Sequence, residues 1–275
     1  MHVRAVLLLL VGCLSLVGCG GEDNDIEQDL QIDRSGSGFV AQFSPADGVI
    51  PFPSNLLFSG SADGTLNIPV VDANDASDPK VAMNSLDGFS TMAPITTTFS
   101  NGIDAATLNG NTVYLYEVTL SGVGGAVTRV VRKLSYGSEF VAGLSPVDNS
   151  QQTMVITPLA PLKPKSHYMV ALTKGIQSVD GQLVTSEATY LLTKSDNPLV
   201  VGGVSQTHSL SDAEAAALEP LRQLTYYQEL ALAGQSISPD MVVLSWTFST
   251  QSVGDVLTMV QSNAVGTTAI NSTPI

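Results

Sequence analysis

The chain has 275 residues and is strongly acidic, with 25 Asp and Glu against 11 Lys and Arg and a formal net charge of −14 at pH 7. Nucleic acids and anionic lipid surfaces are bound through clustered Lys and Arg, so this composition argues against both as electrostatic partners. Because the chain has only two cysteines, no disulfide framework is expected and burial of apolar side chains must hold the fold.

The first eighteen residues have the pattern of a secretory signal. Arg4 is followed by a largely apolar run from Ala5 to Val17, and Gly18 is the small residue before Cys19. A positive start, a short apolar run and a small residue at its end predict export and cleavage. The run has about thirteen residues, fewer than the roughly 20 that a spanning helix needs, so no permanent membrane span is expected.

The end of this segment, Leu16-Val17-Gly18-Cys19, resembles the bacterial lipobox. The resemblance implies cleavage between Gly18 and Cys19 and acylation of Cys19. Because Gly20 and not Asp follows the cysteine, it also implies an outer membrane lipoprotein on the periplasmic or cell-surface side. Several acyl chains on one cysteine anchor a protein stably. An ordinary secretory signal is the alternative.

Residues 19–38 follow the signal peptide of residues 1–18 and contain an acidic stretch with Gly and Ser. The acidic residues are Glu22, Asp23, Asp25, Glu27, Asp29 and Asp33. Few apolar side chains and charges of one sign predict a self-repelling, disordered tether between the lipidated cysteine and the folded part.

Residues 39–204 contain short β-rich runs separated by Pro, Gly, Asn and Asp, which predicts a mainly β fold of the β-sandwich class. The expected strands are 56–58, 65–68, 95–100, 112–120, 127–134, 140–144, 153–157, 168–173 and 189–192, with a hairpin turn at Asp63-Gly64. In the run 161–173, Tyr168, Val170 and Leu172 alternate onto one face, which leaves His167 on the opposite, solvent-facing side. This run resembles bacterial Ig-like modules and implies an Ig-like sandwich.

Residues 205–275 predict a C-terminal helical segment, one more strand and the start of a linker. Ser211 and Glu214 fit a capping box at a helix start, and Pro220 is expected to begin a second helical stretch that ends near Ala233.

The strand expected at 242–248 holds the only tryptophan of the chain. Leu244, Trp246 and Phe248 alternate onto one face, which we expect to be buried in the core. Ser252 with Asp255 is expected to cap a final helix.

The sequence lacks the Gly-x-Ser-x-Gly motif of an α/β-hydrolase nucleophile. Both glycines of that motif are needed because the strand-to-helix turn is strained. The nearest segments centre on Ser209 and Ser236, and each has a side chain at one or both glycine positions. No acidic residue is recognisably paired with His167 or His208. We therefore predict no catalytic residue in this chain.

One acidic loop is a weak calcium candidate. Its oxygen-bearing residues are Asp72, Asn74, Asp75 and Asp78. Ala76 stands where the EF-hand order requires a ligand, so we favour a polar turn over a calcium site. Two histidines and no free cysteine in the exported chain argue against zinc or iron, and no cofactor is expected.

Four segments resemble the N-terminal domain of the bacterial virulence-factor lipases, a family of extracellular lipases that are often lipoproteins. They are Ile50 to Phe58, Asp63 to Pro69, Asn84 to Thr91 and Leu244 to Ser252, within a similarity from about Phe39 to Ser252. In that family a separate α/β-hydrolase domain follows this region and carries the nucleophilic serine. The resemblance therefore implies that the catalytic domain is a partner beyond this chain.

Two functions follow from the sequence. In the first, the chain is the lipid-anchored, noncatalytic N-terminal part of an extracellular lipase, which tethers or positions the hydrolase domain. In the second, it is a complete surface-exposed Ig-like binding or adhesion lipoprotein. A downstream reading frame with Gly-x-Ser-x-Gly favours the first function, and affinity for a glycan or a matrix protein favours the second.

Overall fold

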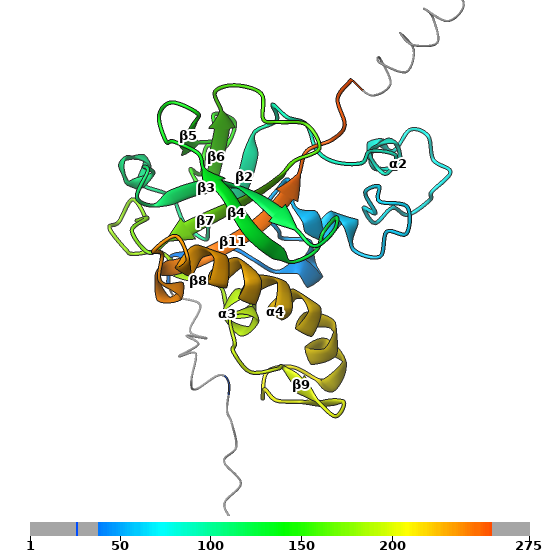
Figure 1. The fold of residues 1–275 in the computed structure, drawn as a ribbon. Helices are drawn as coiled ribbons and strands as arrows, with labels where there is room; N and C mark the ends of the chain where they lie inside the picture. Colours follow the sequence, from blue (N-terminus) through cyan, green and yellow to red (C-terminus); the bar gives the residue numbers. More distant parts are fainter. Residues whose placement is uncertain (1–25, 27–37, 255–275) are drawn as a thin grey trace, which may run out of the picture.

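A computed structural model of the chain describes Ile26 and residues 38–254 (Figure 1). The expected signal peptide, the Gly18–Cys19 cleavage site and the helix expected after Ser252 lie outside the described residues. Two antiparallel sheets pack against each other, and a long helix covers the larger sheet. The predicted β-sandwich with a C-terminal helical segment is confirmed.

The larger sheet has four strands in the order β11-β7-β3-β4. Their bounds are β3 Val113–Leu120, β4 Val127–Lys133, β7 His167–Thr173 and β11 Val242–Ser249. Successive side chains of a strand point to opposite faces. In β7, Tyr168, Val170 and Leu172 face one apolar cluster, while Met169 and Ala171 face another. The predicted alternation is confirmed, and β7 is buried on both faces.

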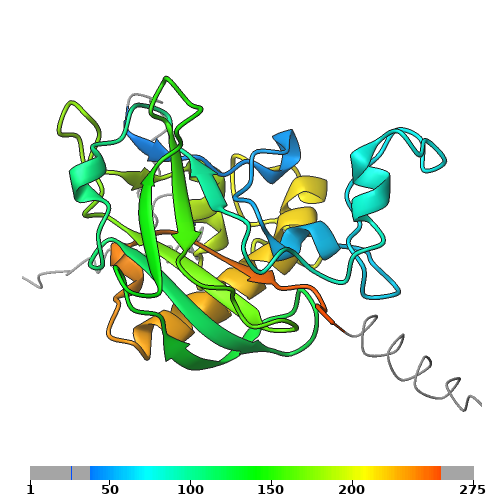
Figure 2. The same ribbon diagram turned by 90° about the horizontal axis from the view of Figure 1, so that it is seen from above.

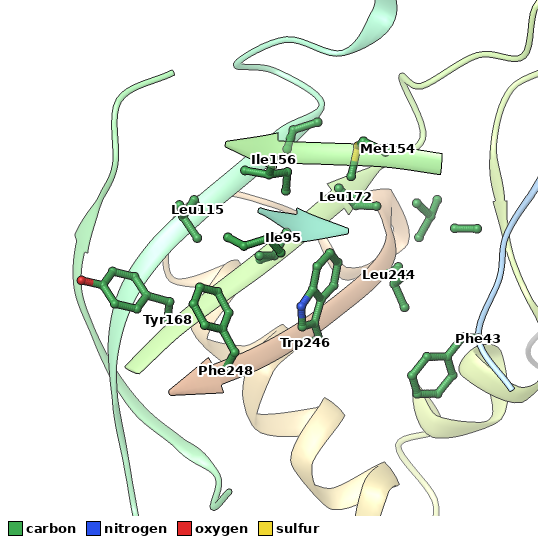
Figure 3. Close-up of a cluster of buried hydrophobic side chains, with 14 of the residues drawn as sticks. Phe43, Ile95, Leu115, Met154, Ile156, Tyr168, Leu172, Leu244, Trp246 and Phe248 are labelled. Carbon is green, nitrogen blue, oxygen red and sulfur yellow. The ribbon is translucent and has the colours of Figure 1, made fainter. Parts of the chain in front are cut away.

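The smaller sheet has three strands in the order β2-β6-β5. Their bounds are β2 Ile95–Thr98, β5 Phe140–Leu144 and β6 Thr153–Pro158. The main core lies between the two sheets (Figure 3): Ile95 and Ile156 meet Leu172 of the larger sheet, and Trp246 and Phe248 pack in the same cluster. The predicted burial of the tryptophan face is confirmed.

Helix α4, Asp212–Ala233, covers the outer face of the larger sheet (Figures 1 and 2). Leu232 near its end and Ile237 just after it pack against Met169. The helix starts with the predicted capping box, because Ser211 Oγ accepts from Glu214 N and the Glu214 carboxylate accepts from Ser211 N.

Pro220 lies inside α4 and does not begin a second helix, so the prediction of two helical stretches is wrong. Proline removes one backbone hydrogen bond from a helix interior. Contacts on both sides of it hold the helix: Glu219 accepts from Leu199 N at 2.9 Å, and Arg222 donates to Ser195 O at 2.9 Å. Tertiary contacts here outweigh the local preference for a break.

Three predicted strands are wrong. Residues 56–58 belong to a 3-10 helix, which Ser54 Oγ caps by accepting from Leu56 N, and residues 65–68 form no strand. Residues 189–192 lie in α3, whose Tyr190 and Leu192 are buried. Short apolar runs fit a buried strand and a buried helical turn equally well, so periodicity alone could not separate them.

The remaining elements are short. They are β1 Val40–Ala41, β8 Thr185–Ser186, β9 Val200–Val201, β10 Val204–Ser205, α2 Pro79–Met83, α3 Ala188–Thr193, and the 3-10 helices Pro45–Asp47, Asn55–Phe58, Ala105–Thr107 and Pro239–Met241. Strand β1 pairs with β8 in parallel, and β9 and β10 form a hairpin. Among the described residues, none of the helices has the length and apolar character needed to span a bilayer.

Ile26 is one of two described residues of the predicted tether, with Gly38 at its end. The Ile26 side chain is 1% exposed and packs in a small cluster with Leu192, Leu199 and Ala215. An apolar side chain that interrupts the acidic residues is therefore buried against the folded part at this position.

Strand β4 forms one edge of the larger sheet, since it pairs only with β3. Three of its seven residues are exposed cations: Arg129, Arg132 and Lys133. Positively charged side chains on an edge strand commonly prevent that strand from pairing with a strand of another molecule.

Candidate functional site

The four segments that carry the family resemblance meet where β11 ends. The first segment is joined to β11 by two side-chain hydrogen bonds. Trp246 Nε1 donates to Pro53 O at 3.1 Å, and Asn55 Nδ2 donates to Thr247 Oγ1 at 3.1 Å. These partners are 193 and 192 positions apart in the sequence, so the segment at 50–58 is fixed onto β11 by long-range contacts.

The two middle segments are joined to each other and to the first. Ile68 N donates to Asn84 Oδ1 at 2.7 Å, and Asn84 Nδ2 donates back to Ile68 O at 2.9 Å. Asn67 N donates to Leu57 O at 2.7 Å. Hydrogen bonds therefore connect all four segments.

The third segment holds the chain as it leaves β11. Phe89 N donates to Ser249 O and Gln251 N donates to Phe89 O, each at 2.8 Å. Ser252 N donates to Asp87 Oδ1 at 2.9 Å. Burial raises the pKa of the Asp87 carboxyl, but the hydrogen bonds from Ser252 outweigh it and the net pKa is lowered, so this carboxylate stays charged at neutral pH.

The opposite side of the departing chain is held by the residues before β7. Thr250 N donates to Ser166 O at 2.9 Å, and Thr250 Oγ1 donates to Lys163 O at 2.6 Å. We call residues 87–89, 163–166 and 249–252 the exit clamp. It fixes the direction in which the backbone leaves the domain.

Gly88 is required by the close approach inside the exit clamp. A Cβ at this position would lie 2.5 Å from Gln251 N, a distance that real Cβ atoms do not tolerate. Glycine is the residue that allows another backbone to come this close.

Exposed apolar side chains surround the exit clamp. They are Phe52, Leu86, Met92 and Val253, with exposed fractions of 39%, 38%, 50% and 53%. The Phe52 ring lies edge-on to Phe89, 5.5 Å between centroids. Exposed apolar groups gathered at one place mark interaction surfaces more often than chance, and here they lie at the point where the chain leaves.

The serines closest to a nucleophile motif do not lie in a nucleophile turn. Ser209 lies in the bend before the capping residue Ser211, and Ser236 lies in the turn after α4 with φ of +64°. Ser209 lies between β10 and α4, but Thr207 and Ser211 hold the two positions at which the nucleophile turn of an α/β-hydrolase needs glycine. Ser236 follows a helix and not a strand.

His167 is half-buried, so its predicted solvent-facing position is wrong. Its Nδ1 lies 2.7 Å from Ser249 Oγ, because these residues are paired directly across β7 and β11. Burial lowers the pKa of the imidazole. Ser249 is 3% exposed, so this serine and histidine form a partly buried cross-strand contact. The register between β7 and β11 cannot be read from local sequence, so the pair was not predicted.

The weak calcium candidates are not brought together. Asp72 Oδ1 accepts from Asn74 N at 2.8 Å, Asp75 Oδ1 from Ser77 N at 2.9 Å, and Asp78 Oδ1 from Lys80 N at 2.8 Å at the start of α2. Within residues 38–254 and at Ile26, no group of three or more His, Cys, Asp or Glu side chains could hold a metal ion.

Two hollows lie near these segments. One is a cavity of about 20 Å³ lined by Asn55, Gln228, Ser245 and Trp246, among others, which is room for a single water molecule. The other, of about 490 Å³, lies between Asp63 and α2. Its one carboxylate, Asp63, accepts from Thr65 N and Ser61 Oγ, so it offers no acid–base pair.

A polar layer lies between α4 and β11. Ser245 N donates to Tyr190 Oη at 2.9 Å, and Ser245 Oγ donates to Gln228 Oε1 at 2.8 Å. Beside them, burial raises the pKa of the Glu229 carboxyl to about 7, although Lys194 Nζ lies 3.1 Å from its Oε1. Lys194 Nζ also donates to Pro239 O at 2.7 Å and to Val242 O at 2.8 Å, so its ammonium is shared between this carboxyl and two backbone carbonyls.

Glu117 joins the exit clamp to the edge of the sheet. Lys163 Nζ lies 2.8 Å from its Oε1, and Arg132 Nε lies 3.0 Å from its Oε2. Burial raises the pKa of this carboxyl, but the hydrogen bonds from Lys163 and Arg132 outweigh it and the net pKa is lowered.

Residues 21–273 match the family described as bacterial virulence factor lipase N-terminal. No curated protein matches the chain. Among solved structures, surface layer protein SbsC, domains 1–6, matches with a TM-score of 0.23 and 19% identity over 34% of this chain and 11% of that one. The N-terminal part of the bacterial S-layer protein SbsC matches with a TM-score of 0.22 and 21% identity over 35% and 19%.

Similarity to these S-layer proteins at such TM-scores carries no argument about fold or function, and this chain spans only a small part of their length. The family match covers nearly the whole sequence, including the four segments that meet at the exit clamp. The chain therefore belongs to the bacterial virulence factor lipase N-terminal family.

Proposed function

We propose that this chain is the noncatalytic, lipid-anchored N-terminal part of an extracellular lipase, and that it holds and orients an α/β-hydrolase domain that follows it. The observation that carries the proposal is the exit clamp. Backbone hydrogen bonds hold the chain on two sides up to Ser252, so a following domain would start from a fixed point in a fixed direction.

The exposed apolar rim supports the same function. Phe52, Leu86, Met92 and Val253 are exposed near the place where the chain leaves β11, and a domain tethered through that chain meets this surface at high effective concentration. Lipid anchoring through Cys19 is proposed on the lipobox resemblance. It would place the assembly on the outer membrane, at its periplasmic or cell-surface side.

The first test is catalytic. The purified chain should not hydrolyse fatty-acyl esters, and the reading frame beyond residue 275 should encode Gly-x-Ser-x-Gly. Turnover by this chain that is abolished by Ser209→Ala or Ser236→Ala would overturn the proposal.

The second test concerns the anchor. The mass of the mature amino terminus, isolated from bacterial membranes, should equal that of a chain that begins at an acylated Cys19. An unmodified amino terminus would overturn the lipid-anchored part of the proposal and leave the orienting role to be tested by itself.

A further inference from the structure

A second apolar surface lies away from the exit clamp, at the tip of the β9–β10 hairpin. Val201 and Val204 are paired directly across the two strands, which places both side chains on the same face. Their exposed fractions are 55% and 58%. Gly202 and Gly203 have φ of +60° and +85°, as a two-residue type I′ turn requires. The hairpin therefore ends in a narrow, uncharged Val-Gly-Gly-Val tip.

The hairpin is held firmly at its base. Ser205 N donates to Asp212 Oδ1 in the first turn of α4 at 2.8 Å, and Gln206 N donates to Leu199 O at 2.8 Å. Val200 packs against the cluster that contains Leu199. Because the base is already ordered, the tip can bind a surface without a large cost in conformational entropy.

Ile26 connects this hairpin to the amino-terminal end of the chain. It is buried in the same cluster as Leu199, on which Val200 also packs. Cys19 precedes Ile26 by seven positions, and seven residues span at most about 25 Å in any conformation. An acyl group on Cys19 would therefore keep the base of the hairpin within that distance of the bilayer.

We propose that the Val-Gly-Gly-Val tip inserts into the interfacial region of the membrane that holds the lipid anchor. This inference rests on the proposed function, because it requires an acylated Cys19. The anchor makes the second contact intramolecular, so a weak affinity of the tip for lipid is sufficient. Asp212 at the base and the net charge of −14 oppose an anionic surface, so the tip favours zwitterionic lipid.

The arrangement also sets the place of the following domain. In Figure 1 the β9–β10 hairpin lies at the bottom of the molecule, and the end of the described chain after β11 leaves at the top. With the tip in the membrane, the exit clamp faces away from it. The domain then acts as a spacer that presents its hydrolase partner above the anchoring bilayer.

The test uses the mature, acylated chain in phosphatidylcholine vesicles, with an environment-sensitive fluorophore on Val204→Cys. Cys13 leaves with the signal and Cys19 is acylated, so the introduced thiol is the one labelled. The control carries the same fluorophore on Val147→Cys, because Val147 is 88% exposed and lies in the loop between β5 and β6. We expect a blue shift and several-fold quenching by nitroxide-labelled lipid at residue 204 but not at residue 147. Val201→Asp beside the label should remove the shift.

Vesicle flotation distinguishes the two possible failures. A chain that does not float contradicts the lipid anchor, and with it the lipid-anchored part of the proposed function. A chain that floats while the label at residue 204 stays as hydrated as the label at residue 147 overturns the inserted tip and leaves the anchor standing. A blue shift that grows with protein concentration without vesicles would identify a second copy of the chain as the occupant and would also overturn the inserted tip.

Discussion

Trp246 of β11 donates a hydrogen bond from its indole nitrogen to the carbonyl of Pro53, 3.1 Å away and 193 positions earlier in the chain. Trp246 is 3% exposed, so this bond forms in the interior. It joins the first segment of the family resemblance to the last.

Trp246→Phe should destabilise the domain by about 1–3 kcal/mol beyond the loss of packing, because the buried Pro53 carbonyl then lacks a donor. Urea unfolding followed by circular dichroism measures this change. The control is Phe248→Leu, which removes volume from the same core without removing a donor. Equal losses for the two variants would show that the indole hydrogen bond contributes nothing.

Gly88→Ala should loosen the exit clamp, because the new Cβ would overlap Gln251 N. We expect a loss of about 1–3 kcal/mol from the forced backbone shift. Hydrogen exchange at the amides of Gln251 and Ser252 should also accelerate. Gly143→Ala is the control, since nothing lies within 4 Å of a Cβ there. Unchanged exchange at both amides in the Gly88 variant would contradict the clamp.

Glu229→Gln should flatten the dependence of stability on pH. Burial raises the pKa of the folded-state carboxyl to about 7 from 4.5, so the folded state holds a proton that the unfolded state loses. The stability from this group is complete below pH 4.5 and is lost as pH rises through 7, a fall on the order of 3 kcal/mol. Free energies of unfolding at pH 5 and pH 8 should differ less in the variant than in the wild type.

Glu117→Gln should have the opposite dependence on pH. Hydrogen bonds from Lys163 and Arg132 lower the net pKa of Glu117, so its contribution is present above pH 4.5 and disappears as pH falls below that value. Because both cationic side chains are partly exposed, solvent screening keeps the loss at pH 7 near 1 kcal/mol. Wild type and variant should converge in stability near pH 3, and a difference that persists there would contradict the ion-pair explanation.

The sequence predicted the sandwich because its strands are long enough to show a pattern. Tyr168, Val170 and Leu172 alternate over a whole strand, and the residues around Trp246 do the same. The capping box at Ser211 was readable because it depends on neighbours three positions apart. Residues 189–192 were predicted as a strand and form part of α3. Four apolar and β-branched residues are too few to show a helical or strand periodicity, and packing against α4 decides their conformation.

The exit clamp could not be located before the structure was known, although the segments that build it were recognised. The bonds from Phe89 to Ser249 and Gln251 depend on how strands far apart in the chain align. The contact between His167 and Ser249 depends on the same alignment. Local sequence motifs do not contain the alignment of distant strands. The requirement for glycine at position 88 follows from the distance between this residue and the backbone of Gln251.

The three cations on edge strand β4 have a consequence for crowding. Proteins held on one membrane are confined to two dimensions, where their local concentration is high and open strand edges meet often. Arg129 and Lys133 place the same cations on this edge in every copy, while Arg132 is ion-paired with Glu117 and Glu139. Edge cations oppose pairing between strands of two molecules. If the chain is anchored as proposed, even densely packed copies should therefore move past one another without joining their sheets into a continuous ribbon.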